Sequence, residues 1–201
     1  CLMWAMSNRK YKTAQALLEN GANPDIIDNT GGFALFDAID FKWGDSRGDE
    51  DAKYVKLLLK YKANPNLNYC SPKIEGETSS VECGTSPLIH AVSKGFEKVE
   101  ALVKAGANIN YATKTGITAS MYALLHQDVK TAYYLIVEKK TDITKPYYYY
   151  KSNTDTINLE DARYPVDLLL EWTFELDSYE YNLKKKIIKE FSKQGINYQE
   201  R

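Results

Sequence analysis

The sequence is poor in cysteine and histidine and has no long apolar run, and each shortage argues against a class of protein. Three cysteines in 201 residues are few and odd in number, which fits a reducing compartment better than a disulfide scaffold. No apolar run approaches the length of about 20 residues that a membrane-spanning helix needs, and no signal-peptide pattern opens the chain. The 26 basic residues nearly balance the 27 acidic ones, so neither nucleic acid nor an anionic membrane is expected as a partner.

What the chain does have is the composition of an ordinary folded domain, with 44% hydrophobic and 26% charged residues, which argues against disorder. Tyrosine is abundant, at 16 residues. Protein interfaces favour this side chain because it offers rigid amphipathic contact area. A biased nucleotide composition would raise the count equally well, and both explanations stay open.

The stretch Gly95–Asn110 shows the local pattern most clearly. Val99, Leu102 and Val103 fall at helical spacing and form one apolar stripe. Gly106 stands where a helix ends in a left-handed residue, a conformation that glycine adopts without steric cost. The other face of this helix is predicted to be polar and to carry Glu97, Lys98, Glu100 and Lys104.

A turn and a shorter helix precede this stretch, with Ser86 as the expected N-cap and Pro87 in the first turn. The two halves recur in alternation along the chain. The second-helix ending returns at 17–24, 58–65, 102–109, 136–143 and 188–197. The first-helix start returns at 32–38, 85–91, 117–123 and 164–169.

This alternation resembles the ankyrin repeat, a unit of about 33 residues with a Thr-Pro-Leu-His-x-Ala signature. The resemblance covers nearly the whole chain. It implies an all-α solenoid of about five stacked helix-turn-helix units with β-hairpin-like fingers, forming a single domain over 1–201. The expected units are 1–28, 29–69, 70–113, 114–146 and 147–201. Cys1 to Ala5 align with Pro-Leu-His-x-Ala, so we expect that the first part of the first unit is missing, and that the irregular last unit is a cap.

Two units are longer than the family repeat. Equivalent alanines at 22, 63 and 107 are separated by 41 and 44 residues. The first surplus is an acidic insertion, 43–51, between helices expected at 34–41 and 52–60, and the second lies in the finger between Tyr69 and Cys83. Cys70 and Cys83 bracket it and are either two unrelated thiols or a disulfide. With no further ligand nearby they make a poor zinc site, and no metal is expected.

The residues that could do chemistry are too few to form a catalytic site. His90 and His126 are not near a nucleophile or a carboxylate cluster that the sequence specifies, and packing or surface roles are expected, with partner contact as the alternative. No phosphate-binding loop or nucleophile elbow occurs. We therefore expect no enzyme activity and no cofactor.

The resemblance places partner contacts on the concave side, on first helices and finger tips. The run 147–150 serves either as contact surface or as packing against the last repeat. The candidate contacts are Phe33, Asp37, Asp40, Phe41, Tyr69, His90, Lys94, Tyr111, Lys114, Tyr122, His126, Tyr147, Tyr148, Tyr149 and Tyr150. The predicted core contains Leu17, Leu18, Leu35, Ala38, Leu58, Leu59, Leu88, Ala91, Leu102 and Val103.

The predicted function is non-catalytic recognition of another protein. A stand-alone binding protein of this kind would be a microbial effector, an inhibitor or immunity-type protein, or an adaptor. The alternative is the recognition domain of a longer chain whose enzymatic or membrane part is absent here. We expect a monomer in the cytoplasm or delivered into a host cytoplasm, with an exported location left open.

Overall fold

The computed structural model describes residues 1–40, 52–70, 83–151 and 156–198, and it divides into two compact units, Cys1–Asn108 and Ile109–Arg201. We treat the units separately. Within the described residues the regular elements are helices, and the only β pairing consists of isolated antiparallel bridges. The predicted all-α class is confirmed. Both predicted insertions, 43–51 and the finger segment 71–82, lie outside the described residues.

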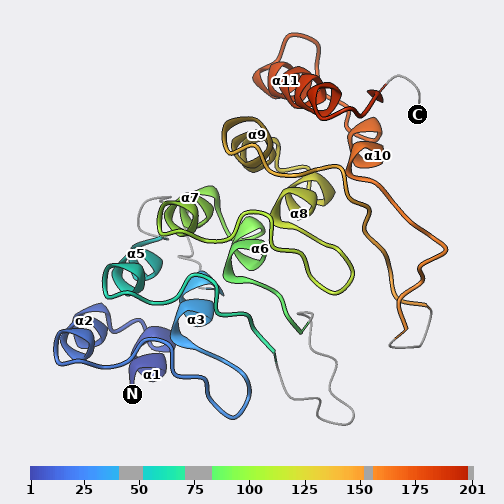
Figure 1. Cartoon of the computed structure of the whole chain (residues 1–201). Coiled ribbons are helices and arrows are strands. Elements are labelled where there is room, and N and C mark those ends of the chain that lie inside the picture. Colours follow the sequence, from blue (N-terminus) through green and yellow to red (C-terminus); the bar gives the residue numbers. More distant parts are fainter. Residues whose placement is uncertain (41–51, 71–82, 152–155, 199–201) are drawn as a thin grey trace. The chain divides into compact units, whose positions relative to one another are not determined.

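Unit 1 consists of paired helices (Figure 1). The first helices, α1, α3 and α6, pack in a row, and each packs on its own second helix. The pairs are α1 (Leu2–Ser7) with α2 (Tyr11–Glu19), α3 (Ala34–Asp40) with α5 (Lys53–Lys60), and α6 (Pro87–Val92) with α7 (Phe96–Lys104).

Unit 2 repeats the arrangement with one irregular second helix. Helix α8 packs on α10, and α9 packs on α11. The elements are α8 (Ala119–Leu125), α9 (Val129–Tyr133), the π-helix η1 (Tyr134–Glu138), α10 (Pro165–Leu170) and α11 (Tyr179–Lys193). Helix α11 begins one turn before the expected start near Leu183, because Ser178 caps it by accepting a hydrogen bond from the Tyr181 amide.

The π-helix absorbs one extra residue. Eleven positions separate the N-cap Gly95 from Gly106 in unit 1, whereas twelve separate the N-cap Asp128 from Lys140 in unit 2. Gly106 and Lys140 both end their helices with a positive φ, so the extra residue must be accommodated inside the helix. It is, since the Lys139 amide donates to the Tyr134 carbonyl, five residues back, at 3.0 Å.

A ladder of side-chain hydrogen bonds joins successive helix-end turns. In unit 1 the Asp25 carboxylate accepts a hydrogen bond from the backbone N–H of Asn64 at 2.8 Å. The side-chain oxygen of Asn66 accepts one from the backbone N–H of Asn108 at 2.7 Å. In unit 2 the Asn110 side chain accepts from the Asp142 amide at 2.9 Å. The same register position therefore fixes the next turn in both units, which holds the finger bases in place.

The core follows the predicted stripes with two corrections. In each pair of adjacent residues predicted to be core, only one is buried: Leu18, Leu58 and Leu102 are buried, whereas Leu17, Leu59 and Val103 are half-buried. Neighbouring residues on a helix point about 100° apart, so both cannot face the core equally. Lys98, predicted on the polar face of α7, is fully buried at 0% exposure. Its ammonium donates to the Ile39 carbonyl at 2.8 Å, so the apolar stem lies in the core while the charge reaches a backbone acceptor.

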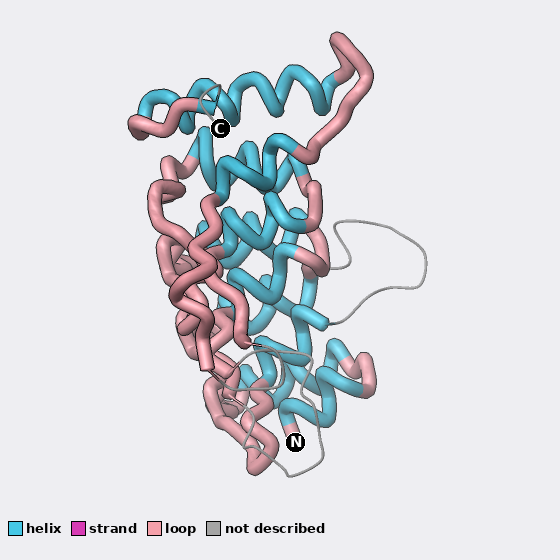
Figure 2. Tube along the Cα trace, turned by 90° about the vertical axis from the view of Figure 1, so that its right-hand side faces the viewer, coloured by secondary structure: helices cyan, strands magenta, loops and turns pink. Residues whose placement is uncertain are grey.

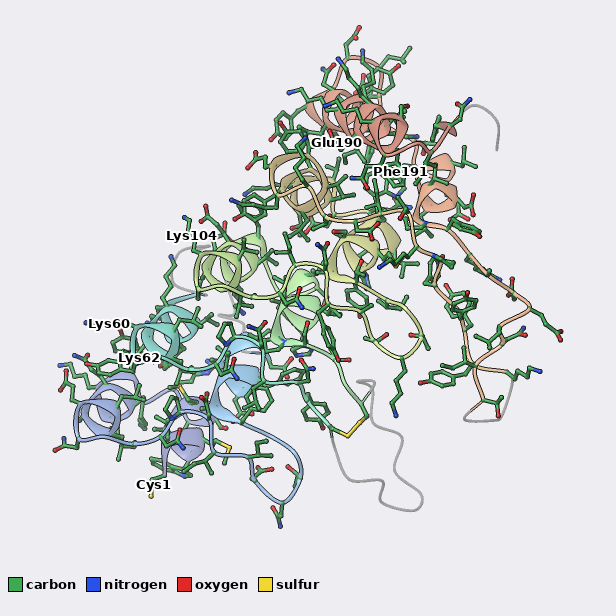
Figure 3. The ribbon with its side chains drawn as sticks, viewed as in Figure 1. Cys1, Lys60, Lys62, Lys104, Glu190 and Phe191 are labelled. Carbon is green, nitrogen blue, oxygen red and sulfur yellow. A yellow bond between two sulfur atoms is a disulfide. The ribbon has the colours of Figure 1, made fainter. Side chains whose placement is uncertain are left out.

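Helix α11 closes unit 2 with both apolar and polar contacts (Figure 3). Phe191 is buried, and the neighbouring Glu190 accepts from Lys140 at 2.9 Å and from Lys193 at 3.0 Å. Gln194 accepts from the Ile143 amide and donates to the Thr141 carbonyl. The last helix is thus tied to the preceding turn by side chains that the sequence pattern alone does not single out.

Candidate partner-binding surfaces

In unit 1 an aromatic stack joins a finger to two first helices. The Phe36 ring of α3 stacks on Tyr69 with centroids 4.7 Å apart and on His90 of α6 with centroids 4.0 Å apart. Tyr69 also pairs with Thr85 in an antiparallel bridge at the base of the finger. The predicted candidates Tyr69 and His90 are therefore brought together, and Phe36, which the sequence analysis did not select, is the ring between them.

His90 belongs to a charged cluster at the same end of α3. Its Nε2 lies 2.9 Å from Asp40 Oδ1, and the Lys94 ammonium lies 2.6 Å from the same oxygen. Desolvation acts to raise the pKa of Asp40, but the hydrogen bonds and charges of His90 and Lys94 outweigh it and lower that pKa to about 2. Because His90 is only 8% exposed, its ring serves this internal cluster and offers little area to a partner.

Asp37, one turn before Asp40 on α3, has the opposite electrostatic environment. Burial, and then the negative charges of Asp28 and Asp40, raise the pKa of Asp37 to about 6. The side-chain hydrogen bond from Ser7 of α1 lowers it only in part. Since Ser7 Oγ also donates to the Met3 carbonyl at 3.1 Å, its single proton serves one acceptor at a time. The negative charge of the Asp37 carboxylate is therefore poorly stabilised by its surroundings.

The remaining unit 1 candidates differ in exposure. Phe33 is 1% exposed, so its ring lies in the core and offers a partner almost no area. It packs on Phe36 with ring centroids 5.4 Å apart. Phe41 lies outside the described residues.

In unit 2 several candidates line α8 and the finger before it. On α8 the rings of Tyr122 and His126 lie one helical turn apart with centroids 4.4 Å apart, and His126 is exposed. Lys114 is exposed at the tip of the finger that the Ala112–Thr118 bridge closes, and Tyr111 is half-buried at its start. These four side chains come from adjacent segments of unit 2.

The tyrosine run divides between core and surface. Tyr147 is 1% exposed and bridges to Arg163, which favours the packing alternative for this residue. Burial raises the pKa of its phenol. Tyr148 is half-buried, whereas Tyr149 and Tyr150 are exposed. The Arg163 guanidinium lies 4.8 Å from the centre of the Tyr149 ring, which presents a cation and an aromatic side by side.

The fingers of unit 2 are packed closely on each other. The Tyr148 amide donates to the Thr115 carbonyl at 2.8 Å. Gly116 has φ +83°, and a Cβ there would lie 2.8 Å from the Pro146 carbonyl oxygen, so only glycine fits. Figure 2 shows the loops that carry these contacts beside the helices. The exposed tyrosines therefore stand on a positioned backbone.

Cys70 and Cys83 are disulfide-bonded in the structure, with Cα atoms 4.2 Å apart. Both residues are exposed, next to the Tyr69–Thr85 bridge, and of the described cysteines Cys1 is free. The bond joins Cys70 and Cys83 directly beside the bridge that Tyr69 of the aromatic stack makes with Thr85. We propose that the bond also forms in solution under oxidising conditions.

Within the described residues no group of three His, Cys, Asp or Glu side chains could hold a metal ion. The described helices also include none with the length and apolar character needed to cross a membrane. What the surfaces offer is exposed aromatic rings, cations and carboxylates on first helices and fingers.

The comparisons with known proteins identify the family. The family model for ankyrin repeats matches residues 51–146 as three copies, and the model for a single ankyrin repeat matches residues 1–29. Together they cover more than half of the chain, so the chain belongs to the ankyrin-repeat family. A search of curated proteins finds no match. The predicted limits of five repeats stay a prediction.

Proposed function

We propose that the chain is a non-catalytic binding protein of the adaptor or inhibitor type, which holds a partner protein against its first helices and finger tips. Ankyrin repeats are in general protein–protein interaction modules. The proposal rests mainly on the exposed Tyr149, Tyr150 and Arg163, which backbone pairing between residues 147–151 and 156–163 holds in place. Rigid aromatic and arginine side chains are the residues that most often dominate binding energy at interfaces.

The backbone pairing of residues 147–150 with residues 157–163 explains why these side chains are available for binding. Tyr147 and Arg163 exchange backbone hydrogen bonds of 2.8 and 2.9 Å, and the Asn158 amide donates to the Tyr149 carbonyl. The backbone that carries the tyrosine rings therefore loses little conformational freedom when a partner covers them. Tyr122 and His126 add a second rigid pair on α8.

A capture experiment tests the proposal. The purified chain is immobilised on a resin and incubated with a lysate of its source organism. A Tyr149→Ser, Tyr150→Ser double variant is treated in the same way. Tyr179→Ser on α11, where the ring is also exposed, is the matched control. We expect a protein that is retained by the wild type and the control but lost from the double variant, with helical circular dichroism unchanged. Equal retention by all three chains would contradict the proposal.

A further inference from the structure

We propose that unit 1 binds an arginine or lysine side chain of the partner between the Trp4 indole and the Asp37 carboxylate, which we name the Trp4–Asp37 site. The inference rests on the proposed function, because it names the chemistry of one contact in that interface. It involves only residues of α1, α3 and the adjoining finger.

The register of the helices gives the two side chains equivalent positions on neighbouring helices. Trp4 and Asp37 occupy the same position of successive first helices, one residue before Ala5 and Ala38, which match the alanine of the repeat signature. Helix α1 packs on α3, and Ser7 of α1 hydrogen-bonds Asp37. Trp4 and Ser7 are three residues apart on α1, so they share a helix face. The indole therefore lies on the same side of α1 as Ser7, the residue that hydrogen-bonds Asp37.

Within the described residues, the cations beside α3 contact Asp40 and not Asp37. The Lys94 ammonium and the His90 ring both contact Asp40. Helix α1 contains no charged residue, and Asp28 of the finger adds a further negative charge. The positive charge of Arg9, in the turn after α1, lies close enough to the Tyr54 phenol of α5 to act against the rise in the pKa of that phenol. Among the described residues, Ser7 is the one whose side chain donates a hydrogen bond to Asp37.

A cationic side chain complements both components of the site. A guanidinium or ammonium group forms a charge-assisted hydrogen bond with a carboxylate and is attracted to the face of an indole. Trp4 is 59% exposed, an unusually open position for the largest side chain. An acidic partner group would be repelled by Asp28 and Asp37, and an apolar one would desolvate Asp37 without pairing it.

A display library of random peptides, selected against the immobilised chain, tests this inference directly. We expect the selected peptides to be enriched in arginine and lysine. The best peptide is then synthesised with each arginine replaced by citrulline, or each lysine by acetyl-lysine, which keeps the shape and removes the charge. The neutral peptide should bind about tenfold or more weakly to the wild type.

Protein variants complete the experiment. Asp37→Asn and Trp4→Ala should each remove the difference between charged and neutral peptides, whereas Glu100→Gln on α7 should preserve it. Asp37→Asn removes a destabilising charge, so loss of folding does not explain its effect. Peptides that bind without a basic preference, or with one that Asp37→Asn leaves intact, would overturn the inference while the proposed function stands. A chain that selects no peptide at all would count against both.

Discussion

The Lys98 ammonium of α7 donates a 2.8 Å hydrogen bond to the Ile39 carbonyl in the last turn of α3. The donor and the acceptor both lie in the core of unit 1, where Lys98 has no exposed surface and Ile39 is equally buried. A lysine near a helix C-terminus also interacts favourably with the helix dipole. The contact thus fixes the end of α3 that carries Asp37 and Asp40.

Removing this lysine should destabilise unit 1. We expect Lys98→Ala to lower the free energy of unfolding by about 2–4 kcal/mol, because a buried stem is lost and the Ile39 carbonyl loses its donor. Lys98→Met retains most of the stem and should cost about 1–2 kcal/mol. Urea denaturation measures both values. The control Lys104→Ala, at an exposed position on the same helix, should change stability by less than about 0.5 kcal/mol; an equal effect of Lys98→Ala and Lys104→Ala would refute the buried role.

The positive φ angles at helix ends lead to a second prediction. Lys62 has φ +65° at the position where Gly21 and Gly106 end the other second helices of unit 1. Lys62→Gly should therefore stabilise the protein by about 1 kcal/mol, since a left-handed conformation costs an L-residue about 1–2 kcal/mol. Gly106→Ala should destabilise it by a similar amount, and purely through the backbone, because a Cβ at Gly106 meets nothing within 4 Å. Thermal melts check the two opposite signs.

Asp37 should make stability fall as pH rises through mildly acidic values. Its pKa is 3.8 when unperturbed and about 6 in the fold, so the folded state binds more protons between those values. Stability that is present below about pH 4 is then lost as pH rises to 6 and above. After allowance for solvent screening we expect Asp37→Asn to raise the free energy of unfolding at pH 7 by about 1–2 kcal/mol.

The pH-dependent measurement has an internal control. The Asp37→Asn gain should disappear near pH 4, where the native carboxyl is already protonated. Asp161→Asn, in an exposed pair with Arg163, should change stability by less than about 0.5 kcal/mol at either pH. A gain from Asp37→Asn that is the same at pH 4 and pH 7 would show that its charge is not the cause.

The disulfide prediction concerns chemical state as well as stability. Alkylation of the unfolded, unreduced chain should label only Cys1, because Cys70 and Cys83 are paired. Cys70→Ser, Cys83→Ser should lower the free energy of unfolding by about 3 kcal/mol relative to the oxidised protein. Intact-mass spectrometry reads the labelling, and three labels on the purified protein would show that the bond does not form.

Much of the fold follows from local sequence pattern. The left-handed ends, the Ser86 cap and the apolar stripes depend on a few neighbouring residues, and the structure has them. The π-helix was not predicted, because the extra residue between Asp128 and Lys140 shows only once the structure gives the start and the end of the helix. Lys98 was misplaced because a lysine in a helical pattern is normally solvated, and its acceptor, Ile39, lies 59 residues earlier. Pattern alone does not reveal an interaction of that range.

The binding surfaces were predictable in register but not in exposure. Repeat alignment selected His90, Tyr69 and Asp40, which the structure brings into one cluster around Phe36. It could not show which ring of the tyrosine run faces inward, since that depends on the bridge between Tyr147 and Arg163. The exposure of Trp4 depends in the same way on which neighbours cover α1.

Site-specific photo-crosslinking tests the central claim, that a partner protein binds the first helices and fingers, most directly. A benzophenone amino acid is placed singly at Trp4, His126 or Tyr150, and as controls at Lys60 or Lys104 on second helices (Figure 3). We predict that the protein captured by the wild type forms a crosslink from at least one first-helix or finger position and from neither control. Crosslinks confined to Lys60 and Lys104 would contradict the account, because the partner would then occupy the opposite helices.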